Sequence, residues 1–186
     1  MNKATLRTRF RDMEYNRPTD RIASASRAVY EKLIGLAIFQ KAQTIGAYLS
    51  LPSEIQTADI IHACWEQGST VCVPYYIPER KYYGMSRLDP AATVRAGKAK
   101  VREPEQPEPV DPATLDLILV PALAFDRSGV RLGHGGGHYD RLLAGVRGFR
   151  LGLAFHEQIV DVLPREPHDM CVQAILTEQQ VIEVPS

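Results

Sequence analysis

The amino-acid sequence predicts an α/β fold, a single domain with a mostly parallel central sheet and helices on both faces in a Rossmann-like three-layer arrangement. Helical periodicity alternates along the chain with continuous apolar runs, and two strand-helix-strand units follow one another. A length of 186 residues is sufficient for one large core and small for two. We therefore expect one domain over residues 1–186.

Two helices are expected before the first strand. Residues 3–15 form the first, which carries an arginine-rich face. The second begins at Asp20, a suitable N-cap residue, and its apolar side chains recur at helical spacing. This stripe, which can face a core, consists of Ile22, Val29, Leu33 and Leu36.

The apolar runs that follow indicate two strand-helix-strand units. Residues 44–51 (TIGAYLSL) and 69–76 (STVCVPYY) are typical of strands covered on both faces. The helix between them is expected over residues 57–68, with Thr57 as N-cap and Gly68 as terminator. The second unit comprises residues 116–125 (DLILVPALAF), a glycine-rich loop, a short helix from His138 or Tyr139, and a strand from Arg150. Two such units predict parallel pairing with right-handed crossovers.

Residues 96–113 carry four prolines and alternating charge. This composition predicts an exposed connector with little regular structure, inside the single domain. A domain boundary at this connector is disfavoured because each half would be small for an independent α/β core.

The overall composition limits the classes of function. The 22 basic and 22 acidic side chains cancel, so the global positive field of a non-specific nucleic-acid binder is missing and any anion must be held locally. Three cysteines without CxxC spacing argue against a disulfide framework or a thiolate zinc site and favour the cytoplasm. We find no candidate membrane span or signal peptide in the sequence, and we expect a monomer that acts on a small molecule.

The stretch RLGHGGGHYDRLL, residues 131–143, is the most distinctive part of the sequence. Four glycines in five residues allow a ligand to approach backbone N–H groups closely, and the helix expected next offers free N–H donors. A Rossmann fingerprint would need glycine at position 138, and a P-loop would need Lys-Ser or Lys-Thr after Gly137. Neither pattern is present. A glycine-rich surface turn is the alternative, but flanking Arg131 and Asp140 favour an anion site.

The pattern RLGxGGGxYDR, preceded by VPxLAFDxxGxR, resembles the signature of the 5-formyltetrahydrofolate cyclo-ligase family, also called methenyltetrahydrofolate synthetases. The resemblance extends to the Lys3/Arg7 start, residues 48–57 (YLSLPSEIQT), the VPYY strand end and a late HDM segment. It implies an enzyme that uses ATP and Mg²⁺ to convert 5-formyltetrahydrofolate to 5,10-methenyltetrahydrofolate, ADP and phosphate.

The resemblance also implies residue roles on the nucleotide side. Lys3 and Arg7 would bind the ATP phosphates, and their spacing of four places them on one helix face. Arg131 and Tyr139 would be catalytic, and Asp140 and Asp169 would bind Mg²⁺. A merely solvated cationic face, or a capping role for Asp140, is the alternative. The implied nucleotide loop consists of Arg131, Leu132, Gly133, His134, Gly135, Gly136, Gly137, His138 and Tyr139.

On the folate side, the resemblance implies Glu54, whose carboxylate can accept two N–H bonds from an aminopyrimidine edge, and Leu49 in the same pocket. Tyr75 is among several tyrosines that either stack on the substrate or simply pack near a strand end. An ordinary loop role for Glu54 is the alternative. The remaining folate-binding residues implied are His134, Gly135, Gly136, Gly137 and His138.

His138 departs from the family pattern, which mostly has Tyr or Phe there, and a histidine can titrate near neutral pH. This departure keeps a second hypothesis open, a non-catalytic binder of a nucleotide or phosphorylated metabolite. A third, a nucleic-acid module using the arginine-rich first helix, is weakened by the zero net charge.

Overall fold

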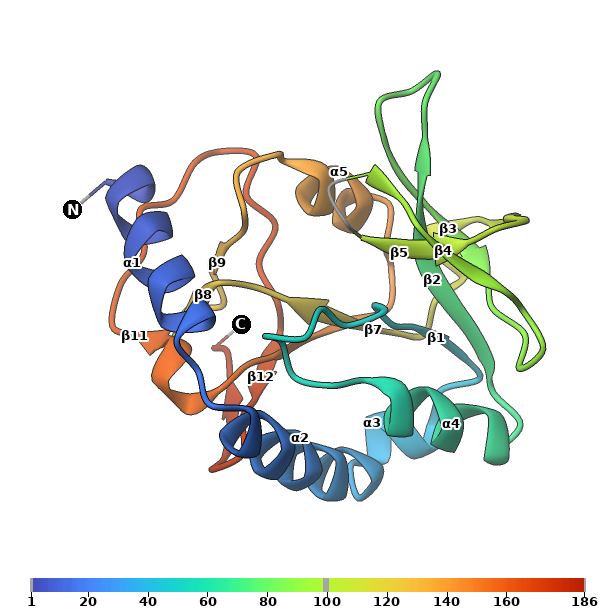
Figure 1. The fold of residues 1–186 in the computed structure, drawn as a ribbon, viewed down its shortest axis with the longest axis horizontal. Helices are drawn as coiled ribbons and strands as arrows, with labels where there is room; N and C mark the ends of the chain where they lie inside the picture. The colour runs from blue at the N-terminus through green and yellow to red at the C-terminus, as the bar shows by residue number, and fades with distance from the viewer. Residues whose placement is uncertain (1, 99–100, 186) are drawn as a thin grey trace.

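The computed structural model describes residues 2–98 and 101–185, shown in Figure 1. The helices are α1 (Lys3–Tyr15), α2 (Thr19–Ile34), α3 (Ala37–Lys41), α4 (Ala58–Glu66), α5 (His138–Ala144) and the 3₁₀ turns η2 (Pro112–Thr114) and η3 (His156–Gln158). The strands are β1 (Thr44–Gly46), β2 (Thr70–Ile77), β3 (Tyr82–Arg87), β4 (Val94–Ala96), β5 (Arg102–Pro104), β6 (Glu108–Val110), β7 (Leu117–Pro121), β8 (Ala124–Asp126), β9 (Arg131–Leu132), β10 (Phe149–Leu153), β11 (Ile159–Val160), β12 (Ala174–Leu176) and β13 (Val181–Glu183).

A central eight-stranded sheet has the order β13-β12-β10-β7-β1-β2-β3-β6. The five strands from β12 to β2 pair in parallel, and antiparallel strands flank them on each side. From β1 the chain moves outward through β2, and from β7 it moves the opposite way through β10 and β12. The strand order therefore reverses between β1 and β7, which is where open α/β sheets bind ligands.

Helices cover both faces of this sheet, as the sequence predicts. Helices α2, α3 and α4 lie on one face and α5 on the other (Figure 1). The core of the first face includes Val29, Leu33 and Ile60, and that of the second includes Leu142 and Leu143. Because the two crossovers run in opposite directions over opposite faces, they have the same hand. The mostly parallel three-layer fold is thus confirmed. Over the described residues, no helix combines the length and apolar character that crossing a membrane requires.

Helix α1 packs against a separate small sheet with the order β11-β8-β9 (Figure 1). Leu6 and Phe10 of α1 are buried against Leu123, Val130 and Leu132. The side chain of Asn2 caps the helix by accepting a hydrogen bond from the Thr5 N–H at 2.9 Å. This packing brings the first turns of the chain next to the glycine-rich loop that follows β9.

The expected helix over residues 3–15 matches α1, whereas two other expected boundaries are wrong. Helix α2 begins at Thr19 with Pro18 as N-cap, and Asp20 lies in its first turn, where a carboxylate also favours the helix dipole. Strand β1 ends at Gly46, five residues earlier than expected. The apolar run continues because Tyr48 is buried beyond the strand and donates to the carbonyl of Ile55 at 3.0 Å.

The expectation that residues 96–113 have little regular structure is also wrong. Strands β4 and β5 form a hairpin, and β6 adds to the edge of the central sheet beside β3. Pro109 is accommodated because β6 is an edge strand. Glu103 of β5 is buried and accepts a hydrogen bond from the Tyr76 N–H at 2.8 Å. Residues 99–100, within the predicted connector, lie outside the described residues.

Asp126 organises the turn that leads into β9. Its buried carboxylate accepts hydrogen bonds from the backbone N–H groups of Ser128, Val130 and Leu163 at 2.9 to 3.0 Å and from the Ser128 hydroxyl at 2.7 Å.

We predict that Asp126→Ala lowers the free energy of unfolding by about 3 kcal/mol, because these donors lose their buried acceptor. Urea unfolding measures the loss. Asp161→Ala, at an exposed site nearby, is the control, and equal stability of the two variants would contradict the assignment.

Candidate active site

A cavity of about 670 Å³ opens where the strand order reverses. Pro121 at the end of β7 and the residues that follow β1 form one wall, while α1, the glycine-rich loop and the 166–169 segment form the others. The lining residues are Lys3, Arg7, Arg11, Tyr48, Leu49, Leu51, Glu54, Pro74, Tyr83, Val101, Pro121, Arg131, Gly133, His134, Gly135, Gly136, Gly137, His138, Tyr139, Asp140, Glu166, His168 and Asp169. Most of the residues predicted from the sequence therefore meet in one place.

The glycine-rich loop depends on backbone conformations that favour glycine. Gly135 has φ of +105° and Gly137 has φ of +63°, and Gly137 is the N-cap of α5. A Cβ built on Gly137 would meet no atom within 4 Å, so the backbone there borders open space. The loop therefore leaves room for a ligand beside backbone N–H groups.

Helix α1 presents a row of cations to this loop. Nε of Arg7 donates to the carbonyl of Gly133 at 3.0 Å, and Nη2 of Arg11 donates to the carbonyl of His134 at 2.7 Å. Lys3 lies one turn before Arg7 on the same face. Burial, helped by the positive charges of Arg11, Arg131 and Arg7, lowers the pKa of His134, which favours a neutral imidazole. The positive charge at this wall comes from the arginines and Lys3.

Arg131 enters the cavity from β9 with a side chain that is only 5% exposed. Its Nη2 lies 3.0 Å from a carboxylate oxygen of Asp140, and its guanidinium carbon lies 5.3 Å from the centre of the Tyr139 ring. Its Nε is buried without a hydrogen-bond partner in the described part of the chain. Burial raises the pKa of Tyr139, as does the charge of Glu54, although Arg131 opposes the shift, so the phenol keeps its proton.

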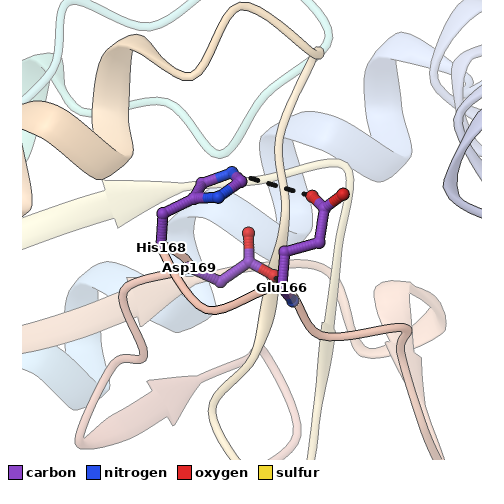
Figure 2. A group of neighbouring side chains, drawn as sticks. All are labelled: Glu166, His168 and Asp169. Atoms are coloured by element: carbon purple, nitrogen blue, oxygen red, sulfur yellow. Dashed lines mark hydrogen bonds and ion pairs between the residues drawn. The ribbon is translucent and has the colours of Figure 1, made fainter.

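Acidic side chains gather at the far side of the cavity. Lys3 donates to Asp169 and to Glu166, each at 2.7 Å. His168 lies 3.7 Å from Glu166, as Figure 2 shows together with Asp169. Burial opposes ionisation of Asp169, but the hydrogen bonds from Lys3 and from the Glu166 N–H prevail and lower its pKa. One potential ligand atom from each of Glu166, His168 and Asp169 lies within 4.8 Å of the others. Carboxylate oxygens of this kind suit a hard cation such as Mg²⁺.

Glu54 lines the cavity from the loop after β1. One of its carboxylate oxygens accepts a hydrogen bond from the Leu51 N–H at 2.8 Å. Burial raises the pKa of Glu54 to about 7, the Leu51 hydrogen bond partly offsets this, and the charge of Glu14 adds to it. A largely desolvated carboxylic acid in a cavity is a strong candidate for recognising a ligand with N–H donors.

Tyr83 and His138 form an aromatic corner of the cavity. Their ring centres are 5.3 Å apart in an edge-to-face arrangement, and Tyr76 packs edge-on against both. Burial, then the charges of Lys98 and Arg141, lower the pKa of His138, so the neutral ring is favoured. His138 thus occupies an aromatic environment, as the usual Tyr or Phe would.

Two predicted residues are absent from the described lining. Leu132 is 1% exposed and packs with α1 in the core of the small sheet, so its side chain is not available to a nucleotide. Tyr75 pairs with Gly84 of the neighbouring strand β3. Pro74, the residue before it, lines the cavity, and successive side chains of a strand point to opposite faces, so the Tyr75 side chain points away from the cavity. Tyr75 is therefore not part of this lining, and the folate-binding role implied for it stays a prediction.

The structure also adds cavity residues that the sequence reasoning missed. Arg11 follows Arg7 by four residues, so helical spacing alone could have identified it. Tyr83 was one of several neighbouring tyrosines with no signal to distinguish it. Glu166 carried no recognisable motif, and Tyr48 was not singled out within the YLSLPSEIQT segment that it begins; the fold brings both to the site.

The switch-point position, the glycine cradle and the cationic wall together define an α/β protein with a cavity suited to an anion. Comparison with known proteins specifies the family. The model of the 5-formyltetrahydrofolate cyclo-ligase family matches residues 1–178. The chain belongs to this family of ligase enzymes, as the sequence motif predicts.

Individual relatives agree. The chain is 33% identical to 5-formyltetrahydrofolate cyclo-ligase of Mycolicibacterium smegmatis over an alignment 193 positions long, which covers 97% of this chain and 96% of the relative. It is 32% identical to the mouse enzyme of that name over 165 residues, covering 80% and 79%. The NMR structure of Aquifex aeolicus 5,10-methenyltetrahydrofolate synthetase superposes with a TM-score of 0.87 at 29% identity, covering 100% of this chain and 94% of that one.

The elevated pKa of Glu54 leads to a prediction about stability. Below about pH 7 the folded protein holds a proton on Glu54 that the unfolded chain releases above about pH 4.5. The carboxyl's contribution to stability therefore falls as pH rises between these values. We predict that Glu54→Gln stabilises the protein relative to wild type by about 2 kcal/mol more at pH 8 than at pH 5. Urea unfolding at both pH values measures this, with Glu79→Gln at an exposed site as control. A gain independent of pH would contradict it.

Proposed function

We propose that this chain uses ATP and Mg²⁺ to cyclise 5-formyltetrahydrofolate to 5,10-methenyltetrahydrofolate, with release of ADP and phosphate. The observation that carries the proposal is the cavity itself, whose lining combines a glycine cradle and cations with the carboxyl of Glu54. The cradle and the cations suit a polyphosphate, and the carboxyl suits the N–H edge of a pterin. Family membership supports the same reaction.

The chemistry of the substrate explains why ATP is needed. An N-formyl carbon is a poor electrophile, and its oxygen is a poor leaving group. Transfer of the γ-phosphoryl group to the formyl oxygen gives an iminium phosphate, N10 attacks its carbon, and loss of phosphate with the N10 proton leaves the methenyl bridge. Catalysis then rests on positioning the two substrates and stabilising the transferred charge.

Lys3 and Arg7 bind the ATP phosphates in this proposal, together with the N–H groups of residues 133–137. Arg11 extends the same cationic row. Arg131 neutralises charge that develops during transfer, and its buried, unpartnered Nε is a donor available for this. Tyr139 keeps its proton and donates a hydrogen bond to the reacting oxygens.

Asp140 and Asp169 hold Mg²⁺ in this proposal, as oxygen ligands beside the phosphate cradle. The ion supplies charge neutralisation for the phosphate oxygens. Asp169 suits this role because its carboxylate lines the cavity, where Lys3 already contacts both of its oxygens. Lys3, which now pairs with Asp169, would be free to contact phosphate if Asp169 held the ion.

Glu54 binds the aminopyrimidine edge of the folate, and Leu49 packs against the pterin. The edge-to-face pair of Tyr83 and His138 replaces Tyr75 as the aromatic surface available to the substrate. His138 and the loop residues from His134 to Gly137 border both the nucleotide and the folate parts of the cavity.

The proposal is tested by incubating the purified chain with 5-formyltetrahydrofolate, ATP and Mg²⁺. We expect the methenyl absorbance to appear, with one ADP formed per product, and to vanish when ATP or Mg²⁺ is omitted. The corresponding 5-formimino folate serves as the competing substrate. Tight ATP binding without ADP or methenyl product would reject the reaction and favour the non-catalytic binder.

The glycine cradle predicts a specific loss in Gly137→Val. A side chain there enters open space beside the expected phosphates, and φ of +63° adds strain. We expect turnover to fall by about 100-fold or more. Gly68→Val is the matched control, because Gly68 has φ of +83° with open space around it but lies at the end of α4, outside the cavity lining. A similar loss in both variants would show that backbone strain alone is responsible.

A further inference from the structure

Arg17 is a buried cation that the reaction described above does not use. It lies in the short connection between α1 and α2, and its side chain is only 1% exposed. Its Nε donates to Glu157 at 2.9 Å, and its guanidinium carbon lies 3.7 Å from the centre of the Phe155 ring. Stacking on one side and an ion pair at one edge fix the plane of the guanidinium.

The third contact of Arg17 reaches the loop that carries Glu54. Its Nη1 donates to the carbonyl of Ser53 at 2.8 Å. This carbonyl and the N–H of Glu54 belong to the same peptide unit, and that N–H donates to the carbonyl of Leu51 at 3.1 Å. Both polar ends of the peptide unit that precedes Glu54 are therefore held, one by Arg17 and the other by the loop itself.

The geometry points to Arg17 as a positioning residue that orients Glu54 toward the folate. The inference rests on the proposed role of Glu54 in folate binding. Arg17 is not among the described residues that line the cavity, so it acts through the Ser53 peptide and not on the substrate. The carboxylate of Glu54 accepts a hydrogen bond from the Leu51 N–H, and the Glu54 N–H donates to the Leu51 carbonyl, so both contacts start from the peptide unit that Arg17 holds.

Arginine is specifically suited to this position. The guanidinium places two N–H donors at fixed angles, one toward Glu157 and one toward Ser53, while its flat face covers Phe155. A lysine ammonium is a single point charge that cannot keep this planar arrangement. The planar shape of the Arg17 side chain is thus more important than its charge. A lysine at this position keeps the charge but loses the planar shape, so it separates the two contributions.

The experiment compares Arg17→Met and Arg17→Lys with wild type in the methenyl absorbance assay. We expect KM for 5-formyltetrahydrofolate to rise about tenfold in both variants, while KM for ATP stays unchanged. In the Glu54→Ala background, Arg17→Met should add no further rise in folate KM, because a residue that acts through Glu54 has no effect once Glu54 is gone. Unfolding curves confirm that each variant is folded under assay conditions.

Arg21→Met is the matched control. Arg21, in the first turns of α2, pairs with Glu178, which also accepts a hydrogen bond from the His156 N–H at the start of η3. In the described part of the chain, Arg21 donates no hydrogen bond to the loop that carries Glu54. Its folate KM should equal that of wild type. Parallel increases in the folate and ATP KM, additive effects with Glu54→Ala, or full rescue by Arg17→Lys would each overturn the inference. A wild-type chain that forms no methenyl product would instead reject the proposed function.

Discussion

The hydrogen bonds from Arg7 and Arg11 to the carbonyl groups of Gly133 and His134 are the contacts on which the site depends. They join the first helix to a loop more than a hundred residues later, and the core around Phe10 supports them. Because the net charge of the chain is zero, an anion can be held only where cations are concentrated locally. Docking α1 on the glycine-rich loop produces that concentration, and the loop carbonyls limit the mutual repulsion of the cations.

The cavity contains its own counter-charges. Lys3 pairs with Asp169, and the buried Arg131 pairs with Asp140, so each of these cations has an acidic partner in the described structure. These pairs combine the residues proposed for phosphate binding with those proposed for Mg²⁺ binding. In the proposed reaction, the carboxylates would hold the ion of a magnesium nucleotide and the cations would contact its phosphates. Few charges would then lack partners, with or without the nucleotide. Binding could therefore proceed by an exchange of ion-pair partners, without a large rearrangement of the backbone.

Sequence reasoning predicted the parts of this molecule that are local. The helix over residues 3–15 and the strand-helix-strand units follow from periodicity, and the glycine-rich loop follows from composition. The position of Tyr75 outside the cavity lining could not be predicted, because the alternation of β2 is known only once its pairing with β3 fixes which face meets the cavity. Strand β1 was extended too far because an apolar run can also bury Tyr48 beyond a strand. Arg17 carries no motif, since its partners Ser53 and Glu157 are distant in sequence.

Glu54 shows how the fold supports a costly functional group. A carboxyl group with a pKa raised to about 7 by burial is destabilising at neutral pH, so its presence is not explained by folding. The surrounding loop is nevertheless highly organised, because Gln56 donates to the carbonyl groups of Leu51 and Glu54, and Ser26 accepts from the Gln56 N–H. Such support around one unfavourable side chain is expected where the orientation of that side chain matters more than its contribution to stability.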